Sequence, residues 1–464
     1  MTTITNERYE INAVSKCCER FIKRFKVNKL LRKVNATKEK GVPAYDIFAF
    51  LLGLVFSGKN LYTLLSSSSK ETVTFGKDVM YRFLSKAFIN WNAFLLYLSC
   101  SVITDVNILT SDDRKTAIII DDTPYYRNRS KKVELLSKFY DHSEKRYYRG
   151  FTLLTMGWTD GQTFMPIDFR VVANSDEKKL FEGSHIKKND NRTLATKRRD
   201  DARKEKPKLV IDMLKSVKGT PAEAKYVLFD SWFSSPSSLL SVNKAGYRVV
   251  SRLKNNKNFK FKYEGKMLPI NKIFAINKKR RGMSRYLLSV TVEVCHKDFE
   301  KSIPAKIVYV RDKNNRKKWI ALISTDTALG EDEIIALYGK RWDIEPFHKV
   351  IKSCLRLEKE FQVRSYDAIV AHTAIVMTRY VFLSLENREN KDIRSVNEGF
   401  RMLCDELEDI SFIGAIELII SVFKQRCLDY LHLSKEKINA AVGCFISCLP
   451  CYIRDRLGFS LCES

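Results

Sequence analysis

Five side chains between residues 338 and 352 have types and spacing that suit phosphate chemistry. A tyrosine, an arginine, one acid and two lysines follow one another at intervals of 3, 4, 4 and 3 residues: Tyr338, Arg341, Glu345, Lys349 and Lys352. On a helix with 3.6 residues per turn, these intervals place all five side chains on one face. Such a face would hold a phosphate backbone against a metal-binding carboxylate. The alternative is a solvated amphipathic helix with ordinary ion pairs.

Pro346 directly follows the acid of this stretch. Proline removes a backbone donor and disfavours helical geometry at the residue before it. The sequence therefore predicts that a helix begins or bends near Glu345, which would interrupt a continuous face running back to Tyr338.

Two apolar segments upstream each end in aspartate. TAIIIDDT, from residue 116, reaches Asp121 and Asp122, and KYVLFD, residues 225 to 230, ends in Asp230. Apolar, β-branched runs of this kind are typical of buried strands. Carboxylates at the end of a buried strand are costly unless a cation meets them, although each aspartate could instead cap a turn. Neighbours on a strand face opposite ways, so periodicity does not decide between Asp121 and Asp122.

The stretch YGKRWDIEPFHKVIK, residues 338 to 352, resembles the Tyr-x2-Arg-x3-Glu-x6-Lys signature of DDE transposases from bacterial insertion sequences. Tyr338, Arg341, Glu345 and Lys352 match this signature without a gap. The surrounding RWDIEPFHK is similar to the usual wording of the family, and the match covers about fifteen consecutive positions.

The resemblance implies a catalytic set of three acids. Asp121-Asp122-Thr123 is similar to the first motif of the family, Asp-x-Ser/Thr, with Asp121 as the ligand and Asp122 in reserve. DSWF, which begins at Asp230, is similar to the second motif, and Glu345 supplies the third acid. Three carboxylates in one pocket do not all ionise without cations. Two divalent ions on Asp121, Asp230 and Glu345 are therefore expected, with Mg²⁺ as the species and Mn²⁺ as a substitute.

The basic and aromatic residues of the match are expected to bind DNA. Arg341, Lys349, Lys352 and Tyr338 are assigned to phosphate contacts, which position the duplex without reading its sequence. Trp319, in KKWIALIST, lies at a place similar to that of an aromatic residue that stacks on a flipped base in related transposases. Its alternative is a core tryptophan on a strand.

The elements that must position these residues predict an α/β fold. Strands are expected near 149–157, 163–172 and 247–253, and helices near 208–218 and 235–244, with a polar loop over 174–208. This order is that of an RNase H-like mixed-sheet core, in which the two acid-bearing strands lie side by side. We expect five regions along the chain. Residues 1–110 are helical and could bind DNA ends or cap the core, residues 111–253 form the first part of the core, and residues 254–328 form a β-rich insertion. Residues 329–375 form the last part of the core, with the catalytic Glu, and residues 376–464 are helical.

Composition agrees with a partner that carries negative charge. Lys and Arg outnumber Asp and Glu by 82 to 54 in 464 residues, for a formal charge of +28. Such a field favours polyanions. We identify no membrane-spanning run, since the longest apolar stretch, residues 47–56, is too short. We also identify no secretory signal, and eleven irregularly spaced cysteines favour free thiols and a cytoplasmic location.

The sequence thus predicts a transposase that acts in the bacterial cytoplasm on nucleoid DNA. It would cut double-stranded DNA at terminal inverted repeats and join the ends to target DNA, acting as a homodimer as the resemblance implies. One alternative is a stand-alone metal-dependent DNA nuclease on the same core. Another is an inactive DNA-binding protein derived from a transposase.

Overall fold

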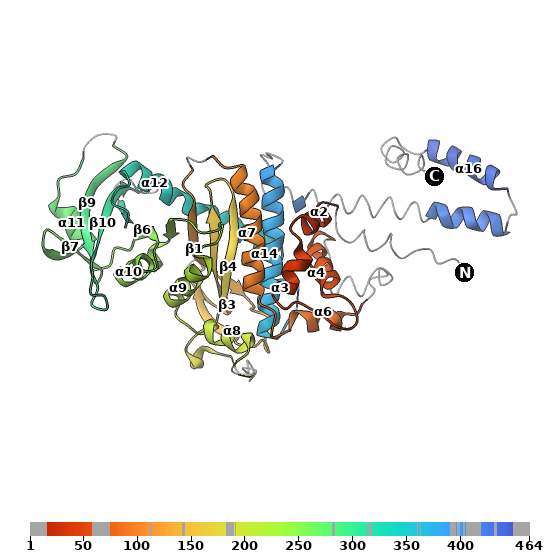
Figure 1. The fold of residues 1–464 in the computed structure, drawn as a ribbon, viewed down its shortest axis with the longest axis horizontal. Coiled ribbons are helices and arrows are strands. Elements are labelled where there is room, and N and C mark those ends of the chain that lie inside the picture. The colour runs from red at the N-terminus through yellow and green to blue at the C-terminus, as the bar shows by residue number, and fades with distance from the viewer. Residues whose placement is uncertain are drawn as a thin grey trace.

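The computed structural model describes residues 16–57, 75–111, 114–141, 144–181, 190, 192–280, 284–312, 315, 318–359, 361, 363–389, 396, 400–401, 404, 419–430 and 434–448. One mixed sheet crosses much of the molecule, with helices packed against it (Figure 1). The RNase H-like α/β fold predicted from the sequence is confirmed.

Eleven strands form the sheet, in the order β2-β3-β1-β5-β6-β11-β10-β9-β7-β8, with β4 paired to β3. Their bounds are β1 Ala117–Tyr126, β2 Ser137–Asp141, β3 Arg146–Thr159, β4 Phe164–Val172, β5 Tyr226–Phe229, β6 Arg248–Leu253, β7 Lys260–Tyr263, β8 Lys266–Pro269, β9 Tyr286–Val294, β10 Ile303–Arg311 and β11 Trp319–Ser324.

The two acid-bearing strands are neighbours. β1 and β5 pair in parallel, with Ile120 opposite Phe229, so that Asp121 and Asp230 are the next residues on adjacent strands. β1 does not end at its aspartates, as the sequence suggested, but continues along β3 to Tyr126. It can do so because β3 still supplies a hydrogen-bonding partner beyond the end of β5.

In the sequence, strands β7 to β11 lie between the first part of the core and Glu345. β11 pairs antiparallel with β6, and β10 and β9 follow, so these strands extend the core sheet sideways. Figure 1 shows them at the end of the molecule away from the N-terminal helices.

Helices pack against the sheet and form the described N-terminal part of the chain, and one more, α16, lies near the C-terminus. They are α2 Lys16–Arg24, α3 Val27–Lys33, α4 Ala44–Gly53, η2 Leu54–Ser57, α6 Lys77–Leu84, α7 Trp91–Ile108, η4 Glu177–Lys179, α8 Leu194–Ala202, α9 Lys206–Val217, η5 Ser231–Phe233, α10 Pro236–Lys244, α11 Ile270–Ile276, α12 Glu331–Gly339, η6 Lys340–Asp343, α13 Ile344–Ser353, α14 Tyr366–Glu389 and α16 Lys435–Ser447.

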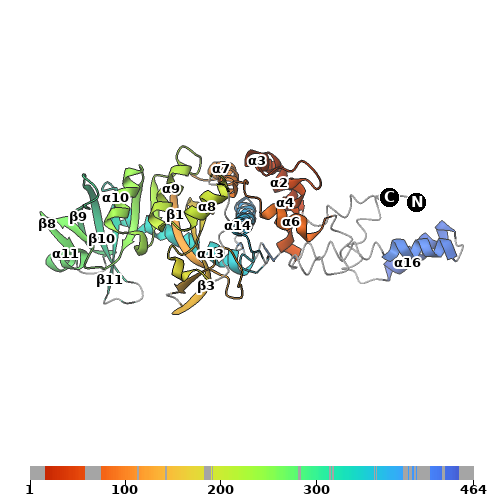
Figure 2. The same cartoon turned by 90° about the horizontal axis from the view of Figure 1, so that it is seen from below.

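Helix α14 is the central helix of the molecule. It lies between the sheet and the N-terminal helices, as the view from below shows (Figure 2). The helix is long and apolar enough to cross a membrane, which the sequence reading missed because Thr378 and Arg379 interrupt its apolar runs. Its most apolar window is entirely buried inside the protein, as in the core helix of a soluble fold. Arg379 donates to the carbonyl of Leu52 at 3.0 Å, which ties α14 to α4.

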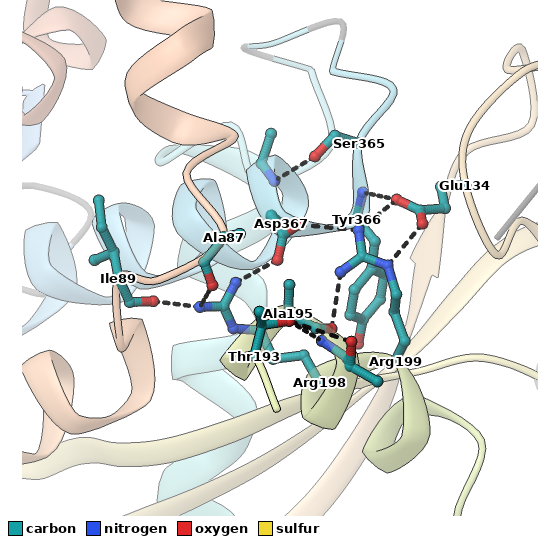
Figure 3. Close-up of polar contacts among 12 residues, drawn as sticks. Ala87, Ile89, Glu134, Thr193, Ala195, Arg198, Arg199, Ser365, Tyr366 and Asp367 are labelled. Carbon is teal, nitrogen blue, oxygen red and sulfur yellow. Dashed lines mark hydrogen bonds and ion pairs between the residues drawn. The ribbon is translucent and has the colours of Figure 1, made fainter. Parts of the chain in front are cut away.

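The segment predicted as a polar loop, 174–208, contains helix α8. The loop prediction was wrong because Arg198 and Arg199 of α8 form ion pairs inside the protein instead of being solvated. Arg199 donates to both carboxylate oxygens of Glu134, at 2.7 and 2.8 Å, and to Asp367 at 2.9 Å. Arg198 binds the same Asp367 and the carbonyl of Ile89 (Figure 3). This network joins α8, α14, the loop before β2 and the segment before α7.

Candidate active site

Asp121 lies on β1 where β5 ends beside it. Its Oδ1 accepts a hydrogen bond from the backbone N–H of Asp122 at 2.9 Å. Burial raises the pKa of Asp121 to about 7, and the charges of Asp122 and Asp230 add to this rise against the opposing effect of Arg341. A buried carboxyl with two acids beside it is short of positive charge.

Asp122 faces different partners from its neighbour. Its Oδ2 pairs with the ammonium group of Lys206, at the start of α9. The same ammonium group lies 4.8 Å from the centre of the Trp232 ring. Lys206 therefore links Asp122 on β1 to the segment that follows Asp230, a role that the sequence analysis did not foresee.

Asp230 closes β5 and begins the η5 turn. Its Oδ1 accepts from the N–H of Ser231 at 2.5 Å, so this aspartate does cap a turn, which was the alternative to a ligand role. It also contributes to the raised pKa values of Asp121 and Tyr338. Asp230 thus combines a local capping contact with a place in the acid cluster.

Glu345 is joined to Asp121 through Arg341. The guanidinium Nη1 lies 3.7 Å from Oδ2 of Asp121, and Nη2 lies 3.2 Å from Oε1 of Glu345. Burial acts to lower the pKa of Arg341, but the charges of Tyr338, Asp121 and Glu345 raise it overall. The arginine stays charged and fills the space between two of the acids.

The five residues predicted on one helical face come from three segments. α12 carries Tyr338, η6 carries Arg341, and α13 begins at Ile344 just before Glu345. A single continuous helix through all five residues is therefore wrong. The prediction from Pro346, that a helix begins near Glu345, is confirmed, because α13 starts at Ile344. Pro346 occupies the first turn of α13, where a missing N–H costs little.

The two lysines of α13, Lys349 and Lys352, lie on different sides of the helix. Lys352 donates to Oγ1 of Thr123 at 2.8 Å, which places its ammonium group two residues from Asp121 on β1. Lys349 is exposed and lines a cavity of about 1320 Å³ together with Glu345 and Trp342. Tyr338 is buried, with the guanidinium of Arg341 5.9 Å from its ring centre.

Aromatic side chains near the acids differ in exposure. Trp319 is half-buried, with its ring centre 4.8 Å from that of Phe274 and 5.0 Å from that of Tyr309. Trp232 and Trp342 are 53% and 56% exposed, next to Asp230 and Arg341 respectively. Their positions in DSWF and RWDIE were visible in the sequence, but nothing in the spacing separates an exposed ring from a core one.

The carboxylates of these acids are chemically suitable ligands for a divalent cation. Oxygen ligands from carboxylates are those that Mg²⁺ prefers, and burial together with the charges of Asp122 and Asp230 raises the pKa of Asp121. Within the described ranges, no three His, Cys, Asp or Glu side chains are close enough to form a ligand set as they stand. Asp121 and Asp230 would hold the ion, and Glu345 is connected to them by Arg341.

A comparison with protein families identifies the family of this chain. The sequence model of a family described as DDE superfamily endonuclease matches residues 45–298, which include Asp121, Asp122 and Asp230 and end before Glu345. A search of curated proteins finds no match to the chain. Because the matched range is more than half of the 464 residues, this chain belongs to the DDE superfamily of endonucleases, whose members generally use divalent metal ions to cut DNA.

Proposed function

We propose that this chain is the transposase of a bacterial insertion sequence. It acts as a homodimer in the cytoplasm, cuts double-stranded DNA at terminal inverted repeats, and transfers the 3′ hydroxyls to target DNA. The observation that carries the proposal is that Asp121 and Asp230 directly follow the last paired residues of the parallel strands β1 and β5, with Arg341 joining Asp121 to Glu345. The motif around Glu345 supports a transposase over other nucleases on this core.

The proposed ligands of Mg²⁺ are Asp121, Asp230 and Glu345. Asp121 is preferred to Asp122 because it shares its surroundings with Asp230 and Arg341, whereas Asp122 is paired with Lys206. When bound there, divalent ions would activate the attacking oxygen and stabilise the leaving oxygen of a phosphodiester.

The cations around the acids are proposed to hold the scissile strand. Arg341 is fixed between Asp121 and Glu345, so neutralising these acids frees its guanidinium to bind a phosphate oxygen. Lys352, beside Thr123, and Lys349, on the exposed side of α13, would contact the phosphates on either side. Tyr338 supports the stacked guanidinium of Arg341.

Trp232 and Trp342 are proposed as the stacking residues for an unpaired base, in place of Trp319. Both rings are more than half exposed beside the acid cluster, while Trp319 already packs on two aromatic rings. A flipped base needs a flat, free surface to replace its lost stacking.

The test is cleavage and joining of a labelled duplex that carries the ends of the element, with Mg²⁺ or with EDTA. Wild-type protein should produce nicks and then joined products only with Mg²⁺. Glu345→Gln should bind the duplex and leave it intact. The matched control is Asp298→Asn, an exposed acid on the β9–β10 turn, which should cut like wild type.

Each alternative has its own outcome in this assay. Metal-dependent nicking without joined products would identify a stand-alone nuclease and reject the transposase. Binding without nicking by the wild type would identify an inactive DNA-binding protein. Cleavage retained by Glu345→Gln would contradict the assignment of the third acid.

A further inference from the structure

A strongly basic cavity opens beside the far end of β1. It has a volume of about 1110 Å³ and lies between the segment 126–133 and the segment that joins α13 to α14. Five exposed cations line it: Arg129, Lys131, Lys132, Lys359 and Arg364. We call these five residues and their cavity the basic groove. Glu358 is the acid that lines it among the described residues.

Among the described residues that line the basic groove, positive charge exceeds negative charge. Glu358 is turned to the backbone, where its Oε1 accepts from the N–H of Tyr126 at 3.1 Å, and burial raises its pKa. Among the residues that the structure describes, no carboxylate pairs with the five cationic side chains. Five like charges around one cavity repel one another and attract a polyanion.

The walls of the basic groove are fixed before any ligand binds. Arg127 is buried and donates to the carbonyl of Phe361 at 3.1 Å, which connects the two segments. The N–H of Glu134 donates to the carbonyl of Arg364 at 2.9 Å. The carboxylate of Glu134 is held in turn by Arg199 and by the N–H of Tyr366 (Figure 3). A preformed groove binds without the cost of ordering its own loops.

Positive charge continues from the basic groove across the edge of the sheet. A second cavity, of about 500 Å³, shares Lys131 and is lined by four more cations: Lys138, Arg149, Lys178 and Lys179. Arg149 lies 4.5 Å from the ring centre of Phe181, and Lys138 lies 4.5 Å from that of Tyr147. The cations thus form an extended path rather than one isolated spot.

The path leads back to the acid cluster along β1. Tyr126, which lines the basic groove, follows Asp121 by five residues on the same strand, or roughly 17 Å at the usual rise of a strand. Lys352 stands between them, bonded to Thr123 and 5.4 Å from the ring centre of Tyr126. Because duplex DNA rises 3.4 Å per base pair, this distance corresponds to about five base pairs.

We propose that the basic groove binds the phosphate backbone of duplex DNA about five base pairs or more from the phosphate that is cut. The inference rests on the proposed function, because it takes the acid cluster as the point of cleavage. The groove holds one flank of the duplex and so sets the direction in which DNA leaves the active site. Its contacts are to phosphate and carry no sequence preference.

The test replaces Lys131, Lys132 and Lys359 by glutamine in one triple variant. The control variant is Lys297→Gln with Lys301→Gln, on the β9–β10 turn. β6 is parallel to β5, and two antiparallel pairings, β6 with β11 and β11 with β10, give β10 the same direction as β5. The turn before β10 therefore lies at the opposite ends of the strands from the acids. All five replaced side chains are exposed, and equal melting temperatures would show that the variants fold.

Affinity for a labelled 30-base-pair duplex is measured over a salt series. The triple variant should bind about tenfold or more weakly at low salt, with a log–log salt slope smaller by roughly 2 to 3, since each lost phosphate contact removes about 0.9. The control should follow wild type.

An unchanged slope in the triple variant would overturn the inference, as would an equal loss in the control. Binding of inorganic phosphate that the triple variant loses, with duplex binding intact, would identify a small-anion site and also overturn it. Failure of the proposed function looks different: the groove-dependent slope would be present, but the wild-type protein would not cut.

Discussion

The described residues include several clusters of arginine and carboxylates, and two of them differ in how the charges are matched. In the buried network of Glu134, Arg198, Arg199 and Asp367, each carboxylate meets a guanidinium within hydrogen-bonding distance. At the end of β5, Asp121 meets Arg341 only at 3.7 Å, and the pKa of Asp121 rises to about 7. Closely matched charges stabilise the fold, whereas the excess of acid around Asp121 is where we propose that a divalent cation binds.

The difference concerns stability as well as chemistry. Removing one partner from a closely paired buried network leaves the other charge without compensation, which is strongly destabilising. Removing one acid from an over-acidic cluster relieves repulsion instead. The two clusters should therefore respond to the same kind of substitution in opposite directions.

The largest effect on stability is expected from Arg199→Ala. It leaves Glu134 and Asp367 buried with less compensation, and should lower the free energy of unfolding by about 3 to 5 kcal/mol. Urea denaturation measures this change. The control is Arg192→Ala, which removes a pair whose arginine side chain is 90% exposed and should leave the midpoint unchanged. A midpoint for Arg199→Ala equal to wild type would mean that the network is not structural.

A smaller effect of opposite sign is expected from Asp121→Asn, measured in EDTA. The pKa of Asp121 is raised in the folded protein, so the unfolded chain loses its proton first as pH rises. The wild type should therefore lose stability between about pH 4 and pH 7, by up to about 4 kcal/mol from this group. The variant lacks this loss and should be the more stable protein at pH 8. Lower stability of the variant at pH 8 would contradict the excess of acid.

The smallest effect concerns His348, on the same helix as Glu345. Burial, together with the charges of Lys352 and Arg341, lowers the pKa of His348 to about 3. Between about pH 6.5 and pH 3 the unfolded chain takes up a proton that the folded protein refuses, so stability falls as pH falls. His348→Gln should reduce that fall by about 2 kcal/mol at pH 5. Parallel curves of stability against pH for variant and wild type would contradict this reading.

Much of the core could be predicted from the sequence, because apolar strands and their acids are local signals. The pairing of β1 with β5, the β3–β4 hairpin, α9, α10 and β6 follow from such patterns. The extension of β1 through Pro124 could not be predicted, since proline argues against a central strand. It is tolerated because β1 has a partner on one side only beyond Ile120.

The candidate site was predictable in its acids but not in its cations. Asp121, Asp230 and Glu345 stand in motifs, while Lys206 reaches Asp122 from 84 residues away with no local signal. Helix α8 was mistaken for a loop because its arginines meet their acids only in the folded protein. Long-range pairing of charge is the information that one sequence lacks.

The most direct test of the central claim compares Asp230→Asn with Asp367→Asn in the same metal-dependent cleavage assay, at a temperature where both variants are folded. The two substitutions remove the same charge from the two clusters. Asp230→Asn should abolish cleavage of the labelled duplex with little change in melting temperature. Asp367→Asn should melt earlier yet cut at the wild-type rate per folded molecule. Cleavage by Asp230→Asn at the wild-type rate would contradict an active site at the end of β5.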